Sequence, residues 1–173
     1  MNLQLVRLSD KYRTQLIDMM DEWTRAGEKI IPYAIRKNDY HDFDRYLAGL
    51  YQAEEGDMPD VTYFCLDVDR DIFVGAVNIC PIWNDGLLES GGNIGDGVRP
   101  SERWRGVATQ MISLALEQCR ELGIAKVLMI CARDNIGSAK SIRNNGGILE
   151  KEIEMDGEIV QMYWIDVRKL HHR

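Results

Sequence analysis

The pattern of apolar and polar positions divides the chain into helical segments and short strands. Apolar residues recur every three or four positions over residues 9–27, 39–52, 106–122 and 135–146, which predicts four amphipathic helices. Runs rich in β-branched and aromatic residues predict strands over residues 3–8, 61–66, 72–80, 93–98, 127–132, 149–155 and 159–167. The segment 28–37 has neither periodicity, so we interpret it as a lid or substrate loop.

Neighbouring segments also predict how some strands pair. Strands 61–66 and 72–80 are close enough for an antiparallel hairpin, and the turn Asp156-Gly157 predicts another between the last two strands. Val127–Ala132 is uninterrupted and apolar, which is typical of a strand covered on both faces in a parallel sheet. Strand 93–98, the helix after it and this strand would form one βαβ unit. The fold class predicted is mixed α/β (α+β).

Composition narrows the functional classes. A length of 173 residues with 45% hydrophobic content fits one domain over residues 1–173. No apolar run approaches the roughly 20 residues of a membrane span, and no signal peptide is recognisable, so we expect a cytoplasmic protein without a membrane partner. Four cysteines lie in apolar stretches, and three histidines form no internal cluster, which disfavours disulfides, a metal site and a Ser-His-Asp triad. The net charge of -7 disfavours nucleic-acid binding and slightly favours a cationic small substrate.

The junction between strand 93–98 and the helix from Gly106 carries the clearest chemical signal. A helix N-terminus presents unpaired N–H groups and partial positive charge, and Gly106 with Ala108 lets a phosphate approach the main chain closely. Arg103 and Arg105 add positive charge. Neither a Walker sequence ending in Gly-Lys-Ser/Thr nor a G-x-G-x-x-G turn is present, so the junction predicts a pyrophosphate site of another kind.

At these residues the chain resembles the GNAT superfamily of acetyltransferases, whose signature V-x-P-x-x-[RQ]-x-x-G-x-[GA] is matched by Val98, Pro100, Arg103, Gly106 and Ala108. The family's second element, N-x-x-[AS] opening a helix that ends in glycine, is matched by Asn135, Ser138 and Gly146. The resemblance implies a central, mostly antiparallel mixed sheet with a parallel pair splayed around the cofactor, flanked by about four helices. The cofactor it implies is acetyl-coenzyme A (acetyl-CoA).

The resemblance also implies which residues hold the cofactor. The amides from Trp104 to Thr109 would bind the pyrophosphate, and the main chain at Val98 would pair with the pantetheine arm and polarise the thioester carbonyl. Asn135 and Ser138 would contact the same arm, although Asn135 also suits a plain N-cap and Ser138 a packing role. Trp104 is either a surface residue or an adenine-side residue. The full predicted set is Val98, Arg103, Trp104, Arg105, Gly106, Val107, Ala108, Thr109, Asn135 and Ser138.

The catalytic groups are less clear from the sequence. An amine with a lysine-like pKa is almost wholly protonated at pH 7, so its attack on a thioester needs a proton acceptor. Glu89, Asp96 and Glu28 are the candidates, with a water relayed by backbone carbonyls as an alternative. Many family members carry a tyrosine acid seven residues after the asparagine, where this chain has Ile142. Substitute donors are Ser141, Tyr33, Tyr40 and Tyr163.

The function predicted is acetyl-CoA-dependent N-acetylation by direct attack of a primary amine, on a small molecule or a peptide. A cysteine acyl-enzyme is the mechanistic alternative. A noncatalytic acyl-CoA-binding module is the functional alternative, supported by Ile142. Proteins of this family are commonly dimers, so a homodimer is one expectation, whereas a nucleic-acid partner is not.

Overall fold

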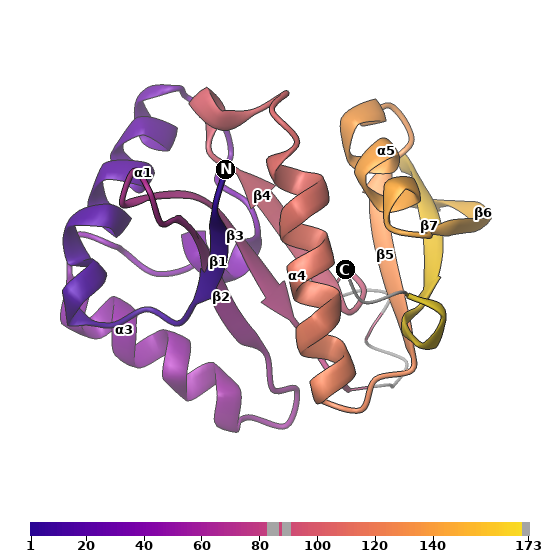
Figure 1. The fold of residues 1–173 in the computed structure, drawn as a ribbon, viewed down its shortest axis with the longest axis horizontal. Coiled ribbons are helices and arrows are strands. Elements are labelled where there is room, and N and C mark those ends of the chain that lie inside the picture. Colours follow the sequence, from indigo (N-terminus) through magenta and orange to yellow (C-terminus); the bar gives the residue numbers. More distant parts are fainter. Residues whose placement is uncertain (83–86, 88–90, 171–173) are drawn as a thin grey trace.

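The protein is described here from a computed structural model, which describes residues 1–82, 87 and 91–170. Within these residues, seven strands form two antiparallel sheets (Figure 1). The first has the order β1-β2-β3-β4, with β1 (Leu3–Val6), β2 (Val61–Asp67), β3 (Ile72–Ile79) and β4 (Ile94–Val98). The second has the order β5-β7-β6, with β5 (Lys126–Ala132), β6 (Ile148–Met155) and β7 (Glu158–Asp166).

Helices cover both faces of the first sheet. The described part of the chain contains α1 (Arg13–Arg25), α2 (Tyr33–Arg36), α3 (Phe43–Gln52), α4 (Val107–Glu121) and α5 (Ile136–Asn144), with short 3-10 turns at Asp10–Tyr12, Ala53–Glu55, Pro100–Glu102 and Val167–Lys169. Side chains alternate along β2, so Phe64 packs into one core with α1 and α3, whereas Cys65 packs into another with α4. In Figure 1, α4 runs between the two sheets, and α5 lies beside β5 and β7.

The predicted elements agree with the structure apart from their ends. The predicted helix 9–27 consists of a 3-10 turn followed by α1. The Ser9 side chain makes no cap, and its main-chain carbonyl accepts a hydrogen bond from the Tyr12 N–H. Helix 39–52 begins later than predicted, at Phe43, after Asp42 caps it by accepting from the Arg45 N–H. The loop 28–37 contains the short α2. Both predicted hairpins are confirmed.

The strand β5 corrects one prediction. Its apolar sequence suggested parallel pairing, but β5 pairs antiparallel with β7, β4 pairs antiparallel with β3, and no parallel ladder joins β4 to β5 in the described residues. β5 is apolar because both of its faces are covered. Val127 and Met129 pack beside α4, whereas Leu128 packs on the opposite face with Met162 of β7.

Asn93 joins the two sheets. This buried residue donates its main-chain N–H to the Leu128 carbonyl at 2.8 Å, and its side-chain Oδ1 accepts from the Leu128 N–H at 2.8 Å. Its Nδ2 also donates to the carbonyl of Cys80, after β3, at 2.9 Å. The neighbouring Gly92 has φ +91°, and a Cβ there would lie 2.5 Å from the Leu128 carbonyl oxygen. One asparagine therefore fixes β4 against β5 where the sheets meet.

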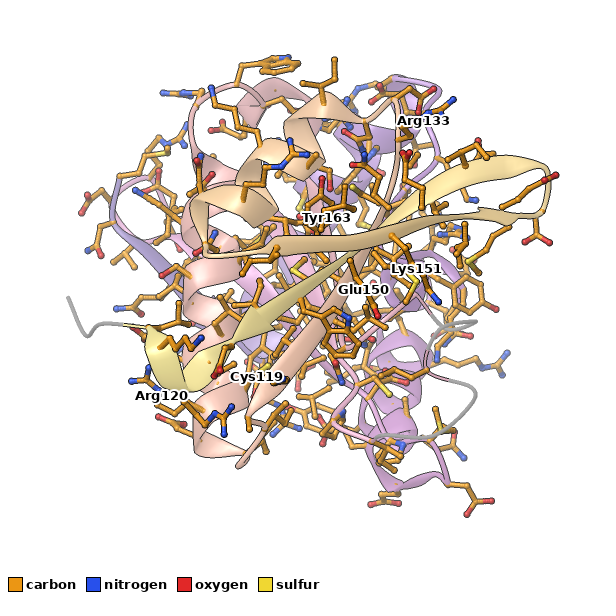
Figure 2. All side chains as sticks on the ribbon, turned by 90° about the vertical axis from the view of Figure 1, so that its right-hand side faces the viewer. Cys119, Arg120, Arg133, Glu150, Lys151 and Tyr163 are labelled. Carbon is orange, nitrogen blue, oxygen red and sulfur yellow. The ribbon has the colours of Figure 1, made fainter. Side chains whose placement is uncertain are left out.

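The second sheet is the more exposed of the two. Figure 2 looks onto it, with Glu150 and Lys151 on β6 and Tyr163 on β7 beside α5. Most of β6 is in contact with solvent, whereas Tyr163 is fully buried beneath the Arg143 guanidinium. No helix among the described residues combines the length and the apolar character needed to cross a membrane.

Candidate functional site

A cavity of about 680 Å³ opens between the end of β4 and helix α5. Asp96, Gly97 and Val98 of β4 line one side of it. The opposite side is one face of α5, where lining residues recur at helical spacing as Gly137, Lys140, Ser141 and Asn144. The turn from Glu102 to Gly106 and the first turn of α4 complete the walls.

The N-terminus of α4 faces this cavity without a side-chain cap. Gly106 is its N-cap residue, with φ +81°, and it offers no side-chain cap to the amides of the first turn. Val107, Ala108 and Thr109, whose N–H groups have no partner within the helix, all line the cavity. A Cβ at Gly106 would meet nothing within 4 Å, so the space beside the helix end is open. This end suits a polyanion such as a pyrophosphate.

The arginines of the same turn are already engaged. Arg103 donates through Nη1 to Glu28 at 2.8 Å and through Nε to the Val98 carbonyl at 3.3 Å. Arg105 donates to Glu102 at 3.2 Å. The sequence suggested that both would supply positive charge to a phosphate. In the structure both are paired with carboxylates that hold the turn to its surroundings, and Arg103 also lines the cavity.

Two further ion-pair groups hold the turn from outside. Glu102 is buried and accepts two hydrogen bonds from Arg70 at 2.8 and 2.9 Å. At the other end, Arg99 is buried and donates to Glu22 of α1 at 2.9 Å. Glu22 also accepts from the N–H and the hydroxyl of Ser101, at 3.1 and 2.9 Å. No local pattern in the sequence predicts these contacts, because the partners lie about 30 to 80 positions apart.

Asp96 is the predicted base candidate that the structure places in the cavity. It lies in the middle of β4, opposite Val77 of β3, and is half-buried. Burial raises the pKa of its carboxyl to about 6. A carboxylate with that pKa is mostly ionised at pH 7 and is a stronger base than an exposed aspartate.

The two other general-base candidates are Glu89 and Glu28. Glu89 lies outside the described residues. Glu28 is exposed and pairs with Arg103, whose hydrogen bond and charge hold the pKa of Glu28 below its usual range. Such a carboxylate is a weaker base than a free glutamate, so the geometry favours Asp96 over Glu28.

Asn135 and Ser138 line the cavity at the start of α5. The Asn135 side chain accepts from the Ser138 N–H at 3.1 Å, so Asn135 is the N-cap of α5. The capping role of Asn135 is compatible with the predicted cofactor contact, because Asn135 and Ser138 both line the cavity.

At the position where many family members carry a tyrosine acid, this chain has Ile142, which belongs to the hydrophobic core. Ile142 is fully buried with α4 and β5, and a Cβ at Gly147 would lie 2.5 Å from its Cγ2. The substitute donors are committed elsewhere: the Ser141 hydroxyl bonds to the Gly137 carbonyl, and the Tyr163 hydroxyl bonds to Gln161. Tyr40 bonds to Asp21, and neither it nor Tyr33 or Tyr163 lines the cavity.

The segment 28–37 reaches the cavity through one residue. Ile31 lines it, and its carbonyl oxygen lies 2.0 Å from where a Cβ on Gly97 would stand. Gly97 is therefore required for this contact, since any side chain would displace the segment from β4. The predicted substrate loop thus packs against the strand that carries Asp96.

Comparisons with known proteins identify the family of the chain and its fold. Residues 17–146 match the model of the acetyltransferase (GNAT) family. No curated protein matches the sequence.

Solved structures give the same result at the level of fold. The ribosomal-protein-S5-alanine acetyltransferase of Vibrio fischeri is 11% identical, with a TM-score of 0.74 over 98% of this chain and 95% of that one. Mutant forms of the spermidine/spermine N-acetyltransferase of Vibrio cholerae are 18% identical, with a TM-score of 0.66 over 97% and 96%. The microcin C7 self-immunity acetyltransferase, solved with acetyl-CoA and AMP, is 15% identical, with a TM-score of 0.69 over 95% and 92%.

Proposed function

The chain belongs to the acetyltransferase (GNAT) family, and we propose that it transfers the acetyl group of acetyl-CoA directly to a primary amine. The observation that carries the proposal is the placement of Asp96 in the same cavity as the uncapped N-terminus of α4. One wall can hold phosphates, and the facing strand offers a base. Acetyl-CoA, when bound, supplies the activated acetyl thioester.

The cofactor grip consists of main-chain groups. The amides of Val107, Ala108 and Thr109 are without side-chain partners and would donate to the pyrophosphate, with the positive end of α4 behind them. The main chain of Val98 would pair with the pantetheine arm. Asn135 and Ser138 would contact that arm from α5. Arg103 and Arg105 support the grip by fixing the turn rather than by touching phosphate.

Asp96 would act on the amine. It would accept the proton that the amine loses, since its raised pKa brings it closer to that of its partner. General base catalysis of this kind contributes about 10²- to 10⁴-fold in rate. The Val98 N–H would donate to the oxygen on which charge develops, as oxyanion donors do. A leaving thiolate would take its proton from the solvent or the substrate, because Ile142 offers none.

Direct transfer is favoured over an acyl-enzyme. All four cysteines are buried, and none of them lines the cavity. Burial raises the pKa of Cys65 and Cys119 to about 12, so their reactive thiolate forms are scarce at neutral pH. The acceptor is a small-molecule or peptide amine. The net charge of -7 favours a cationic one, and solved structures of similar fold carry names that include spermidine and ribosomal-protein acceptors.

An assay for released CoA thiol over an amine panel tests the proposal. The panel contains polyamines, amino acids, aminoglycosides, and peptides with free N-termini or lysines, and titration calorimetry measures acetyl-CoA binding in parallel. We expect binding together with amine-dependent thiol release. Binding without release for every amine would contradict the transferase proposal.

A variant of the grip completes the test. Gly106→Glu places a carboxylate in the open space beside the helix end and should weaken acetyl-CoA binding by at least 100-fold. Gly106→Ala is the control, because it introduces the same left-handed strain at φ +81° without the charge and should cost far less affinity. Wild-type affinity in Gly106→Glu would place the cofactor elsewhere.

A further inference from the structure

Trp104 has an unfavourable backbone conformation, and its aromatic ring is exposed to solvent. Its φ is +63°, a region that bulky residues rarely adopt, and its side chain is 90% exposed. Trp23, by contrast, is fully buried, and Trp164 is half-buried. A glycine at position 104 would suit the backbone better, and no core needs the indole. Backbone strain kept for an exposed ring suggests a role outside folding.

The ring stands at one end of the cavity. Trp104 lines it, and the ring atoms Cη2 and Cζ3 lie 3.6 and 3.8 Å from where a Cβ on Gly137 would stand. The indole thus reaches from the turn before α4 towards the first turn of α5, with the edge of its ring beside Gly137. With 90% of the side chain exposed, the faces of the ring are open to a ligand.

The order of groups in the cofactor decides which part would meet this ring. In the proposed grip, the acetyl end lies at Asp96 and Val98, and the pyrophosphate lies at Gly106 to Thr109. The part of CoA beyond the pyrophosphate is the 3′-phosphorylated adenosine, which must leave the cavity beside the turn that carries Trp104. Adenine is the one aromatic group of CoA, and a base stacks well on an open indole face.

We infer that Trp104 is the platform on which the adenine of acetyl-CoA stacks. The inference rests on the proposed function, because it takes the cofactor's direction from the grip at α4. It adds a contact that distinguishes full CoA from its pantetheine part. Stacking of one base is worth about 1.4 kcal/mol or more, which corresponds to at least a 10-fold change in affinity.

The test compares two acetyl donors, acetyl-CoA and acetylated 4′-phosphopantetheine, which keeps one phosphate of the pyrophosphate and lacks the other together with the 3′-phosphorylated adenosine. Calorimetry measures the first, and competition against acetyl-CoA measures the second. We expect Trp104→Gly to weaken acetyl-CoA binding about 10-fold or more and to leave the truncated donor unchanged. Trp104→Phe should retain most of the affinity, since it keeps an aromatic face. The control is Ile136→Ala, a neighbouring exposed apolar residue that does not line the cavity.

Two readouts do not depend on turnover. Addition of CoA should quench the tryptophan emission of the wild type and leave that of Trp104→Phe nearly unchanged. Trp104→Gly should not lower Tm, because glycine adopts φ +63° without strain. If Trp104→Gly bound acetyl-CoA with wild-type affinity, or lost the same affinity for both donors, adenine would not stack on Trp104. A wild type that binds no acetyl-CoA would instead refute the grip itself.

Discussion

At the scale of single residues, the charged side chains at the site differ in their surroundings. Asp96 is the carboxyl group that lies in the cavity with a pKa shifted towards neutrality, whereas Glu28, a further base candidate in the sequence, is paired with Arg103 outside the cavity. Arg103 and Arg105 resemble phosphate ligands in the sequence, yet they bond to Glu28 and Glu102. Carboxyl groups that are all base candidates in the sequence thus differ in their surroundings, because burial raises the pKa of Asp96 whereas Arg103 lowers the pKa of Glu28.

Asp96→Asn should lower kcat/KM by about 100-fold or more, because the amide cannot accept the proton. In the wild type, kcat/KM should fall as the pH drops below about 6, where Asp96 becomes protonated, and the variant should lack that limb of the profile. Rates between pH 5 and 8 check this, with Asp44→Asn on α3 as a remote, exposed control. Equal profiles for the variant and the wild type would exclude Asp96 as the base.

The stability of the same variant should change in the opposite direction. The folded pKa of Asp96 is raised above its ordinary value of 3.8, so protonation favours the folded state. That contribution is complete below pH 3.8 and is lost as the pH rises through about 6. Asp96→Asn removes the cost of the buried charge and should therefore have an equal or higher Tm at pH 7. Calorimetry at pH 7 separates loss of chemistry from loss of folding.

At the scale of elements, the junction of the two sheets positions the site. β4 carries Asp96 and Val98, and its start is fixed to β5 through Asn93, while Gly92 allows the close approach. α4 and α5 then line the cavity beyond this junction. Ile142 belongs to the core between these elements, so at this position the chain has a packing residue in place of the family's tyrosine.

Asn93→Ala should destabilise the protein by about 2–4 kcal/mol, because it leaves the Leu128 N–H and the Cys80 carbonyl without their side-chain partner. For a chain of this size, the loss in Tm is roughly 4–16 °C. Thermal unfolding followed by circular dichroism measures it. Asn78→Ala is the control, since the Asn78 amide bonds only the side chains of Asp60 and Thr62 and should cost less. Equal losses of Tm in the two variants would show that Asn93 does not stabilise the fold more than Asn78 does.

At the scale of the whole molecule, the cofactor turn is held by distant parts of the chain. Arg70, in the turn between β2 and β3, bonds to Glu102, and Glu22 of α1 bonds to Arg99 and Ser101. The segment 28–37 is tied to the same turn by Glu28. The N-terminal half of the fold therefore fixes the shape of the turn that would receive the pyrophosphate.

Glu22→Ala should lower Tm and weaken acetyl-CoA binding several-fold, since Arg99 would lose one of its two carboxylate partners and Ser101 both of its bonds to Glu22. Burial raises the pKa of Glu22, but hydrogen bonds from Ser101 and Arg99 and the charge of Arg99 lower it overall. Its stabilisation is thus present above pH 4.5 and is lost as the pH falls through the lowered pKa. Tm of both proteins against pH should show a constant gap above pH 4.5 that narrows below it.

Asp18→Asn serves as the comparison for this brace. Asp18 makes one bond to Arg99, and more than half of its side chain is exposed, so its loss should have a smaller effect on Tm and on affinity. If Glu22→Ala bound acetyl-CoA as tightly as the wild type, the brace would stabilise the fold without shaping the site.

The sequence by itself determined most of the elements and predicted the turn at which the cofactor would bind. Helical and strand periodicities, the glycine stops and the Asp156-Gly157 turn are local, so they could be recognised without any partner, and the same holds for the motif from Val98 to Ala108. Only the tertiary structure decided the antiparallel pairing of β5, the pairing of Arg103 and Arg105 with carboxylates, and the position of Asp96, but not Glu28, in the cavity. A pairing, an ion pair and a shifted pKa each depend on groups that are far apart in the chain, and folding alone brings those groups together.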